Sequence, residues 1–196
     1  MKRLFDFVIS LLFTVILLPV FLLIAFLIVI DSGFPVFFVQ KRIGKGGQLF
    51  SMFKFRTMTV LKEAQQGSFD AGNSSRVTRI GKILRKTKLD ELPQLLNVLA
   101  GTMSFVGPRP EVQKWVEAYP ERWAVVHTVK PGITDNASIE FRNEEEILSA
   151  SSEPYLTYRN KILPRKLDLY EDYVRNRSFG GDVEILFKTF ISVLFK

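Results

Sequence analysis

Adjacent carboxylates at Asp90 and Glu91 are the residues of this 196-residue chain that most plainly suggest chemistry. They follow a basic segment and precede Pro93, a residue that is well accepted in the first turn of a helix. A carboxylate can attack phosphorus and form a covalent acyl phosphate, which divides one difficult transfer into two easier steps. Two acids at a helix start are also common because they face the positive end of the helix dipole. The pair alone therefore leaves a catalytic and a purely structural interpretation open.

Two cationic motifs accompany the carboxylates. One is Arg109, which stands between two prolines, and the other is the run Lys54-Phe55-Arg56-Thr57-Met58, with Arg42 upstream. Each motif alone could be a rigid turn or a solvated strand face. Together with the carboxylates they suit a pyrophosphate substrate, whose negative charge Arg and Lys side chains bind. Mg2+ held by one or two carboxylates would neutralise more of that charge.

The charge of the chain is unevenly distributed. Lys and Arg number 27 against 20 Asp and Glu, and twelve of the basic residues lie from Lys41 to Lys88 beside two acids. Such a block predicts anionic partners, which are phosphates, nucleic acid or acidic lipid head groups. The sequence has no Cys and one His, His127, which excludes disulfides, thiolate metal sites and multi-histidine metal sites. Any metal is expected to be a hard cation held by oxygen ligands, such as Mg2+.

The segment from Leu4 to Ile30 is apolar except for Asp6, Ser10 and Thr14. Its length corresponds to a helix of about 40 Å, longer than the ~30 Å hydrocarbon core of a bilayer. Pro19 lies near the middle and would kink the helix, and each half, about 21 Å long, is too short to cross alone. Positive charge flanks both ends, which favours placing both in the cytoplasm. We expect membrane embedding, with a re-entrant helix-break-helix hairpin and a kinked single span both open.

The rest of the chain predicts one mostly helical α+β domain, because no linker or internal repeat divides it. Alternating apolar residues predict a strand at 49–55, the polar run 65–75 predicts a surface loop, and Pro131 with Gly132 predicts a turn. Helices are expected at 79–88, 94–99, 111–119, 144–150 and 162–176. A C-terminal apolar stripe favours core packing over contact with a membrane surface. Its members are Val183, Leu186, Phe187, Phe190, Val193 and Leu194.

Taken together, these motifs resemble the monotopic phosphoglycosyl transferases, the bacterial sugar transferase family that starts glycoconjugate assembly. The resemblance extends over about Lys2 to Thr134 and is dense around the dyad. The matching residues are Leu89 to Leu99, Gly101, Met103-Ser104, Val106 to Pro110, Val39-Gln40, Arg42 to Gly44, Lys54 to Met58 and Lys130 to Thr134.

The resemblance implies a reaction and its residues. A sugar 1-phosphate would pass from a UDP-sugar to undecaprenyl phosphate or another polyprenyl phosphate, with release of UMP. This would be the first membrane step of O-antigen, capsule, exopolysaccharide or glycoprotein glycan assembly. Asp90 would be the nucleophile. Glu91 would complete the dyad, either by binding Mg2+ or by handling a proton. Mg2+ is the implied cofactor, and its implied ligands are Asp90 and Glu91. The expected phosphate-binding residues are Arg109, Lys54, Arg56 and Arg42.

The resemblance also implies a membrane architecture. Residues 1–31 would form a re-entrant helix hairpin broken at Pro19, and residues 32–196 a compact catalytic domain with a small β element and interfacial amphipathic helices. The expected location is the bacterial inner membrane, with the catalytic domain on the cytoplasmic face. Membrane lipids are expected partners, and nucleic acid is not.

Some features depart from the family pattern. Leu18 precedes Pro19 where the family often has Ser, residues 135–144 replace a Gly-rich stretch, and residues 149–164 resemble an insertion, so the transferred sugar is not specified. A non-enzymatic alternative is a membrane-tethered binder of polyanions or acidic lipids, which would give the dyad no role. A second enzymatic alternative is a membrane phosphatase that uses Asp90 covalently and yields inorganic phosphate.

Overall fold

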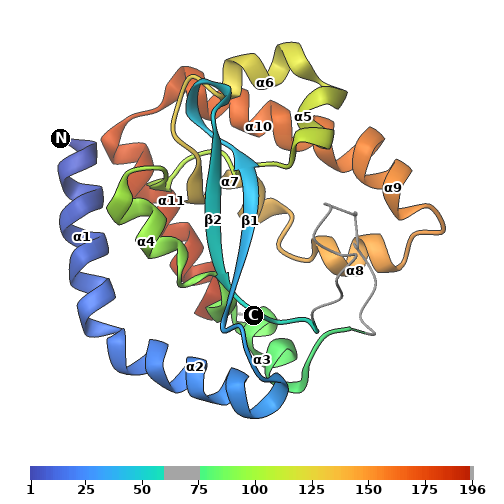
Figure 1. The fold of residues 1–196 in the computed structure, drawn as a ribbon. Coiled ribbons are helices and arrows are strands. Elements are labelled where there is room, and N and C mark those ends of the chain that lie inside the picture. Colours follow the sequence, from blue (N-terminus) through green and yellow to red (C-terminus); the bar gives the residue numbers. More distant parts are fainter. Residues whose placement is uncertain (60–75, 195–196) are drawn as a thin grey trace. The chain divides into compact units, whose positions relative to one another are not determined.

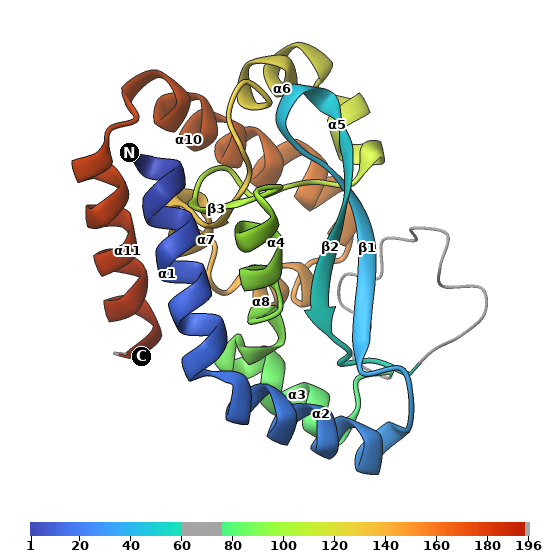
Figure 2. The same ribbon diagram turned by 60° about the vertical axis from the view of Figure 1, so that its left-hand side comes forward.

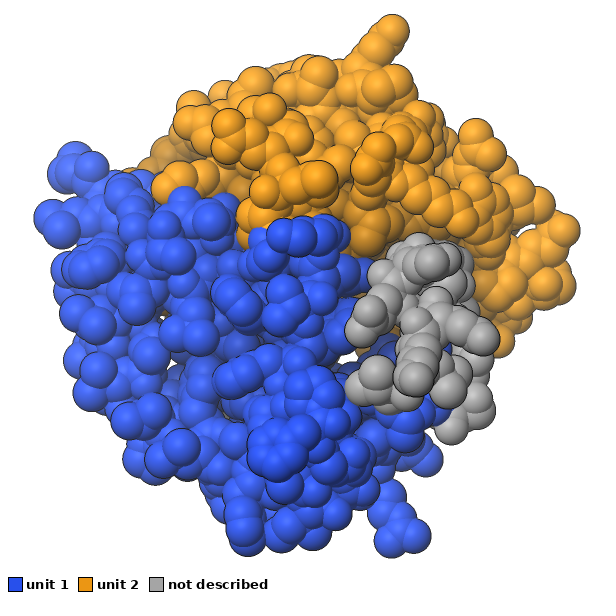
Figure 3. All heavy atoms as spheres, in the orientation of Figure 1, with its two compact units in different colours: residues 1–41, 51–68, 74–103 blue, residues 42–50, 69–73, 104–196 orange. Residues whose placement is uncertain are grey.

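The computed structural model describes residues 1–59 and 76–194, and the chain divides into two compact units (Figure 3). The first unit contains the described residues of 1–41, 51–59 and 76–103, and the second contains 42–50 and 104–194. The loop predicted at 65–75 lies outside the described residues. A boundary at residue 31 between hairpin and catalytic domain stays a prediction.

The chain forms a mostly helical α+β structure, which confirms the predicted class (Figure 1). Within residues 1–59 and 76–194, two small sheets are present, β1 with β2 and β3 with β4. The first part of the chain forms α1 (Lys2–Ile16), α2 (Leu18–Ser32), β1 (Phe37–Ile43), the 3-10 turn η1 (Lys45–Gly47), β2 (Leu49–Phe55), α3 (Arg79–Thr87), the 3-10 turn η3 (Leu89–Glu91) and α4 (Gln94–Ala100). The second part forms β3 (Ser104–Val106), α5 (Gln113–Ala118), α6 (Pro120–Val126), β4 (Gly132–Thr134), α7 (Asn136–Glu140), α8 (Glu144–Ser149), α9 (Pro154–Thr157), the π-helical turn η4 (Tyr158–Ile162), α10 (Leu163–Asn176) and α11 (Phe179–Leu194).

The N-terminal apolar segment is a bent helix pair. Helices α1 and α2 meet at Leu17 with a bend of 59°. Pro19 lies in the first turn of α2, where its ring and missing N–H prevent one helix from continuing through the break. Within the described residues no single helix has the length and apolar composition to cross a bilayer, whereas this pair passes the same test as a broken span or a re-entrant loop.

Helix α1 has its polar side inward and its apolar side outward. Asp6 and Ser10 are buried, whereas large apolar residues such as Val15 and Ile16 are 63% and 58% exposed. The buried side of α1 packs along α4, and the two helices lie side by side in Figures 1 and 2. Arg3 joins them, donating hydrogen bonds to the carbonyls of Val98 (2.6 Å) and Leu99 (2.8 Å) at the end of α4. An aqueous surface would favour the reverse arrangement of polar and apolar sides.

The core of the first unit joins α2, β2 and α3. Its buried members are Phe21, Ile24, Ile28, Phe55 and Leu84. The ring of Phe55 meets Phe21 edge to face at 5.3 Å between centroids. Phe55, the last residue of β2, is therefore packed directly against α2.

Glycine at position 81 permits a close approach between α3 and the end of the Lys54–Met58 run. Thr78 caps α3 by accepting a hydrogen bond from the N–H of Gly81 (2.9 Å). A Cβ atom at Gly81 would lie 2.1 Å from the carbonyl oxygen of Thr57, so any residue other than glycine would clash with it. This contact fixes α3, and the dyad that follows it, against the strand end.

The second unit contains a parallel pair of short strands that sequence patterns do not reveal. Ser104 of β3 pairs with Gly132 of β4, and Val106 pairs with Thr134. The predicted turn at Pro131 and Gly132 is therefore wrong, since Gly132 begins β4 and Pro131 directly precedes that strand. A Cβ atom at Gly132 would lie 2.1 Å from the backbone nitrogen of Gly107, so the two chain segments meet where a side chain does not fit.

The predicted helices occur close to their expected bounds, but three residues of the C-terminal stripe are exposed. Val183, Phe187 and Phe190 are 47%, 63% and 61% exposed, so the prediction of core packing is wrong for them. The buried side of α11 instead contains Ile185 and Thr189, whose hydroxyl is 2.7 Å from the hydroxyl of Thr134. Apolar residues occur on both sides of this helix, and only its neighbours decide which side is covered.

Candidate active site

The dyad lies in the first unit on η3, between two helices. Lys88 ends α3 in the left-handed conformation (φ 58°), which turns the chain into η3. Asp90 is 8% exposed, and Glu91 is half-buried. Pro93 then begins the passage into α4, as its preference for a first helical turn predicts. Two consecutive carboxylates are thus held in a short rigid turn with little contact with water.

Lys54 is one of the predicted cationic residues, and the structure places it beside the dyad. Its ammonium nitrogen Nζ lies 2.9 Å from Oε1 of Glu91, and both side chains keep less than a fifth of their surface exposed (19% and 15%). Solvent screens such a pair less than it screens a surface pair. The structure therefore brings three of the predicted site residues together: Asp90, Glu91 and Lys54.

Asn97 holds the helix that follows the dyad against β2. Its side-chain oxygen accepts a hydrogen bond from the N–H of Phe53 (3.0 Å), and its side-chain nitrogen donates to the carbonyl of Ser51 (2.7 Å). The side chain is almost fully buried, at 2% exposure of the residue. Because the next residue after Phe53 is Lys54, this double hydrogen bond fixes the distance between the dyad and its cation.

Arg56 has different surroundings from those expected of a phosphate-binding residue. It is 4% exposed, and its guanidinium donates to the carbonyls of Ser32 (3.0 Å), Gly33 (2.6 Å) and Phe34 (2.9 Å). It also donates to the hydroxyl of Ser32 (2.8 Å). Phosphate binding by Arg56 stays a prediction, and these contacts do not favour it, because the guanidinium already holds the chain that leaves α2.

Arg109 lies in the second unit, where it lines a small recess. Pro108 and Pro110 flank it, and Trp123 and His127 complete much of the wall. The His127 ring stacks on Trp123 with centroids 5.2 Å apart. Burial lowers the pKa of His127, which keeps the ring neutral near pH 7. Among the described residues that line this recess, Arg109 is therefore the charged one.

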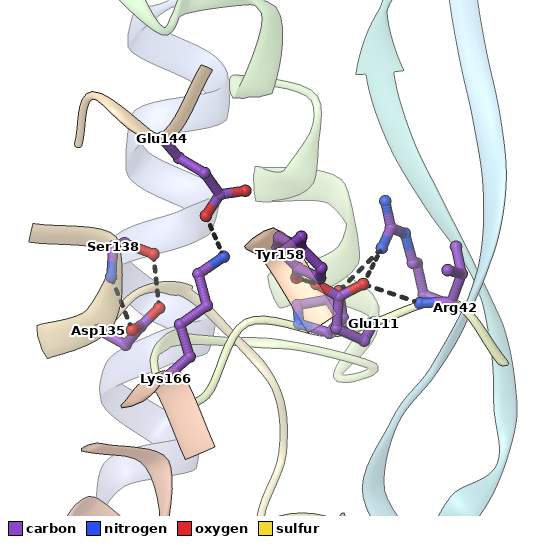
Figure 4. A network of polar contacts seen from close by, with 9 residues as sticks. Arg42, Glu111, Asp135, Ser138, Glu144, Tyr158 and Lys166 are labelled. Carbon is purple, nitrogen blue, oxygen red and sulfur yellow. Dashed lines mark hydrogen bonds and ion pairs between the residues drawn. The ribbon is translucent and has the colours of Figure 1, made fainter. Parts of the chain in front are cut away.

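Arg42, the remaining predicted phosphate ligand, belongs to a polar network of the second unit (Figure 4). Its guanidinium lies 3.0 Å from a carboxylate oxygen of Glu111 and donates to the carbonyl of Pro110 (3.3 Å). The hydroxyl of Tyr158 donates to the other oxygen of Glu111. Burial raises the pKa of Tyr158 well above its ordinary value, and the charge of Glu111 raises it further, so the phenol remains a donor. Arg42 and Glu111 thereby hold the chain on the C-terminal side of the Gly-Pro-Arg-Pro run.

Asp135 and Lys166 are buried charged residues that the sequence patterns did not single out as site residues. Asp135 accepts hydrogen bonds from the N–H (2.9 Å) and hydroxyl (2.6 Å) of Ser138, and thereby caps α7. Lys166 pairs with Glu144 (Figure 4). Asp is one of the preferred residues directly before a helix, and this signal could have identified Asp135 as the cap of α7. Burial at Lys166 depends on neighbours far along the chain, and no local signal marks it.

A pH-dependent stability is expected from Asp135. Burial raises its pKa above the ordinary value of 3.8, although the Ser138 hydrogen bonds and the charges of Arg109 and Lys166 oppose the rise. The folded chain then keeps this proton to a higher pH than the unfolded chain, so the contribution to stability is present below pH 3.8 and is lost as pH rises above it. In Asp135→Asn the side chain is uncharged at every pH. The difference in Tm between the variant and the parent protein should therefore grow in favour of the variant from about pH 4 to about pH 7.

Thermal unfolding followed by circular dichroism at four or five pH values measures this difference. Thr128→Ala, which removes an exposed hydroxyl bonded to the carbonyl of Val125 (2.7 Å), serves as the control because neither of these two groups titrates over the same range. Parallel curves for Asp135→Asn and the parent protein would contradict the expected burial effect.

The carboxylates of the described residues do not form a complete metal cage. No group of three or more His, Cys, Asp or Glu among residues 1–59 and 76–194 could hold a metal ion by itself. The two adjacent carboxylates of the dyad are nevertheless suitable hard ligands for Mg2+, which usually binds one or two protein carboxylates together with substrate phosphates and water. The two carboxylates therefore suit an Mg2+ ion that binds together with a phosphate substrate.

Comparisons with known proteins match the whole chain. A family model described as bacterial sugar transferase matches residues 1–196. The uncharacterised sugar transferase EpsL of Bacillus subtilis is 38% identical over 195 residues, which cover 99% of this chain and 87% of that protein.

Two longer relatives carry names that state a reaction. The UDP-glucose:undecaprenyl-phosphate glucose-1-phosphate transferase of Klebsiella pneumoniae is 37% identical over 192 residues, 96% of this chain. The UDP-N-acetylgalactosamine-undecaprenyl-phosphate N-acetylgalactosaminephosphotransferase of Aeromonas hydrophila is 37% identical over 179 residues, 90% of this chain. The matched region spans 39% of the length of each of these relatives.

Proposed function

This chain belongs to the bacterial sugar transferase family, and we propose that it transfers a sugar 1-phosphate from a UDP-sugar to undecaprenyl phosphate. The observation that carries the proposal is the buried dyad, in which Asp90 is 8% exposed and Glu91 lies 2.9 Å from the ammonium of Lys54. The names of the longer relatives state the same class of donor and acceptor. Different sugars occur in those names, so the sugar itself stays open.

The proposed reaction has two displacements at one phosphorus atom. A carboxylate oxygen of Asp90 attacks the phosphorus that carries the sugar, and the bond from that phosphorus to the oxygen of UMP breaks. UMP leaves, and the sugar phosphate remains bound to Asp90 as an acyl phosphate. A phosphate oxygen of the lipid then attacks the same phosphorus, which restores the Asp90 carboxylate and forms the lipid diphosphate sugar.

Cationic side chains supply much of the charge compensation that phosphoryl transfer needs. We assign this task to Lys54 beside the dyad and to Arg109 in its recess. Arg42 supports Arg109 through the backbone, because it donates to the carbonyl of Pro110. Asp90 and Glu91 would hold Mg2+, which when bound would neutralise part of the diphosphate charge.

We further propose that α1 and α2 form a re-entrant hairpin in the cytoplasmic membrane. Each helix has 15 residues, which corresponds to about 22 Å and is shorter than the ~30 Å hydrocarbon core. The outward apolar side of α1 suits lipid contact, and its inward Asp6 and Ser10 suit packing against protein. Basic residues at both ends favour the cytoplasmic side for the dyad and for the donor nucleotide.

Incubation with a UDP-sugar alone tests the chemistry most directly. In the absence of lipid phosphate, a purified chain in nanodiscs should release up to one UMP per protein and gain the mass of one sugar phosphate. Peptide mapping should place the added mass on Asp90. A competent preparation that turns over with lipid phosphate but never carries this mass would contradict the covalent route.

Product analysis separates the alternatives. Addition of undecaprenyl phosphate to the isolated adduct should yield a lipid diphosphate sugar, whereas a phosphatase would yield inorganic phosphate. A protein that only binds polyanions would release no UMP with any UDP-sugar.

A further inference from the structure

The structure points to a positioning task for Arg56 in the second half of the reaction. The exit of the α1–α2 pair is the segment 32–36, where the chain leaves α2. We propose that Arg56 fixes this exit to the end of β2 and thereby sets the height of Asp90 above the membrane surface, where it meets the phosphate of the lipid acceptor. The inference rests on the proposed function, since it concerns a lipid-borne substrate. It replaces direct phosphate binding as the role of this residue.

The contacts of Arg56 all lie where the chain leaves α2. Helix α2 ends at Ser32, and Gly33 turns the chain with a positive φ of 75°. One terminal nitrogen of Arg56 donates to Ser32 and Gly33, and the other donates to Phe34. The backbone N–H of Arg56 also donates to the carbonyl of Val36 (2.9 Å). Five hydrogen bonds to four residues between 32 and 36 hold this exit against the end of β2.

An arginine suits this position for two physical reasons. The last carbonyls of a helix have no partners within the helix and carry its partial negative charge, so a cation there is favourable. The planar guanidinium can also donate in several directions at once, which the ammonium of a lysine does less well. Because Arg56 is buried at 4% exposure, its replacement would take away the donors that these carbonyls share and would leave the exit without its bonds to the end of β2.

A second contact fixes the same helix end to the start of α3. The carboxylate of Asp31 accepts a hydrogen bond from the backbone N–H of Ile80 (3.1 Å). The chain then runs through α3 to the dyad at Asp90. The exit of α2 is therefore attached to both elements that lead to the dyad.

Strand β2 connects the exit to the catalytic residues over a very short distance in sequence. Ser51 and Phe53 bind Asn97 of α4, Lys54 binds Glu91, and Arg56 binds the exit. All these contacts lie within the first unit. A change at Arg56 would alter the angle between the lipid-embedded pair and the dyad, while the contacts between Lys54 and Glu91 would remain.

The two substrates should respond differently to such a change. The UDP-sugar arrives from water and needs only the local geometry of the dyad. The phosphate of the lipid is held at the membrane surface by its own chain, so its approach to Asp90 depends on the height of the dyad. Misplacement by about 1 Å can cost roughly 100-fold in rate.

Separate measurement of the two half-reactions in nanodiscs tests the proposal. In Arg56→Met, formation of the donor adduct and the first release of UMP should stay within about threefold of the parent rate. Transfer from the adduct to undecaprenyl phosphate should fall by about 10- to 100-fold, with a higher KM for the lipid. Arg56→Lys should also slow the lipid step, but by a smaller factor, because it keeps the charge and lacks the several directed N–H groups of the guanidinium.

Two further variants keep the test decisive. Ser32→Ala removes the side-chain acceptor 2.8 Å from Arg56 and should slow the lipid step selectively, even if Arg56→Met fails to fold. Lys161→Met removes an exposed cation of η4 and should leave both half-reactions unchanged. Equal loss in both half-reactions, or a loss confined to the donor step, would overturn the positioning role. Failure of the parent protein to form any adduct would instead refute the proposed function.

Discussion

Asp90→Asn is expected to lower turnover by roughly four to six orders of magnitude, which is the range seen when a covalent nucleophile is removed. An amide is a poor nucleophile and cannot form the acyl phosphate. The shape of the side chain is nearly unchanged, so the variant should remain folded and membrane-bound. UMP release and adduct mass, measured with the UDP-sugar alone, should both fall below detection.

The matched comparison for this variant is Asp168→Asn, an acidic residue of the second unit whose carboxylate is 56% exposed and 2.7 Å from Arg122. It changes one acid to the same amide and should keep parental activity. Parental adduct formation in Asp90→Asn would assign the covalent step to another residue. Loss of folding in Asp90→Asn, seen as a lower Tm, would instead indicate a structural role for this buried acid.

Lys54→Met is expected to reduce the rate of adduct formation by about 100-fold, comparable with removal of one group that stabilises charge in a transition state. The variant removes the ammonium 2.9 Å from Glu91 while keeping most of the apolar stem. Both the donor step and overall turnover should fall together, because the change affects the dyad itself. This response differs from that expected of Arg56→Met, which should spare the donor step.

A double-mutant cycle checks whether Lys54 acts through its partner. If Lys54 and Glu91 work as a unit, the combination of Lys54→Met with Glu91→Gln should cost little more than the worse single variant. Independent effects that multiply would show that the pair seen here does not matter for the rate. Lys54→Arg should recover part of the activity, since it restores a cation near the carboxylate.

Local signals predicted much of the first unit. A long apolar run with a proline near its middle predicted two short helices, and the break occurs at Leu17. A basic amphipathic segment predicted α3, and the alternation from Leu49 to Phe55 predicted β2. These predictions succeeded because proline chemistry and hydrophobic period act over a few residues.

Contacts between distant residues explain what the sequence could not predict. The contacts of Arg56 with the end of α2 could not be predicted, because its acceptors lie more than twenty residues away (separations of 22 to 24). Tyr158 and Glu111 are 47 residues apart, and nothing in either segment indicates the other. Strands β3 and β4 have three residues each, which is too short for an alternating pattern to appear.

The side of α11 that is buried was also difficult to predict from the sequence. Phe187 and Phe190 resemble core residues in sequence, yet Ile185 and Asp182 occupy the covered side. Asp182 can be buried there because the hydroxyl of Tyr173 donates to it (2.8 Å). Polar contacts of this kind, from Tyr173 to Asp182 and between Thr134 and Thr189, accompany an orientation of α11 that a count of apolar residues alone does not predict.

The hydrogen bonds of Asn97 also limit how the chain can assemble. A two-stranded hairpin leaves the backbone of its outer strand able to recruit a strand from another molecule, which is a common route to aggregation. Along β2 the N–H of Phe53 and the carbonyl of Ser51 are taken by one side-chain amide, which imitates a neighbouring peptide. Two backbone groups of β2 are therefore already satisfied within the chain, by the same amide that holds the helix after the dyad, which disfavours the pairing of a further strand at this position.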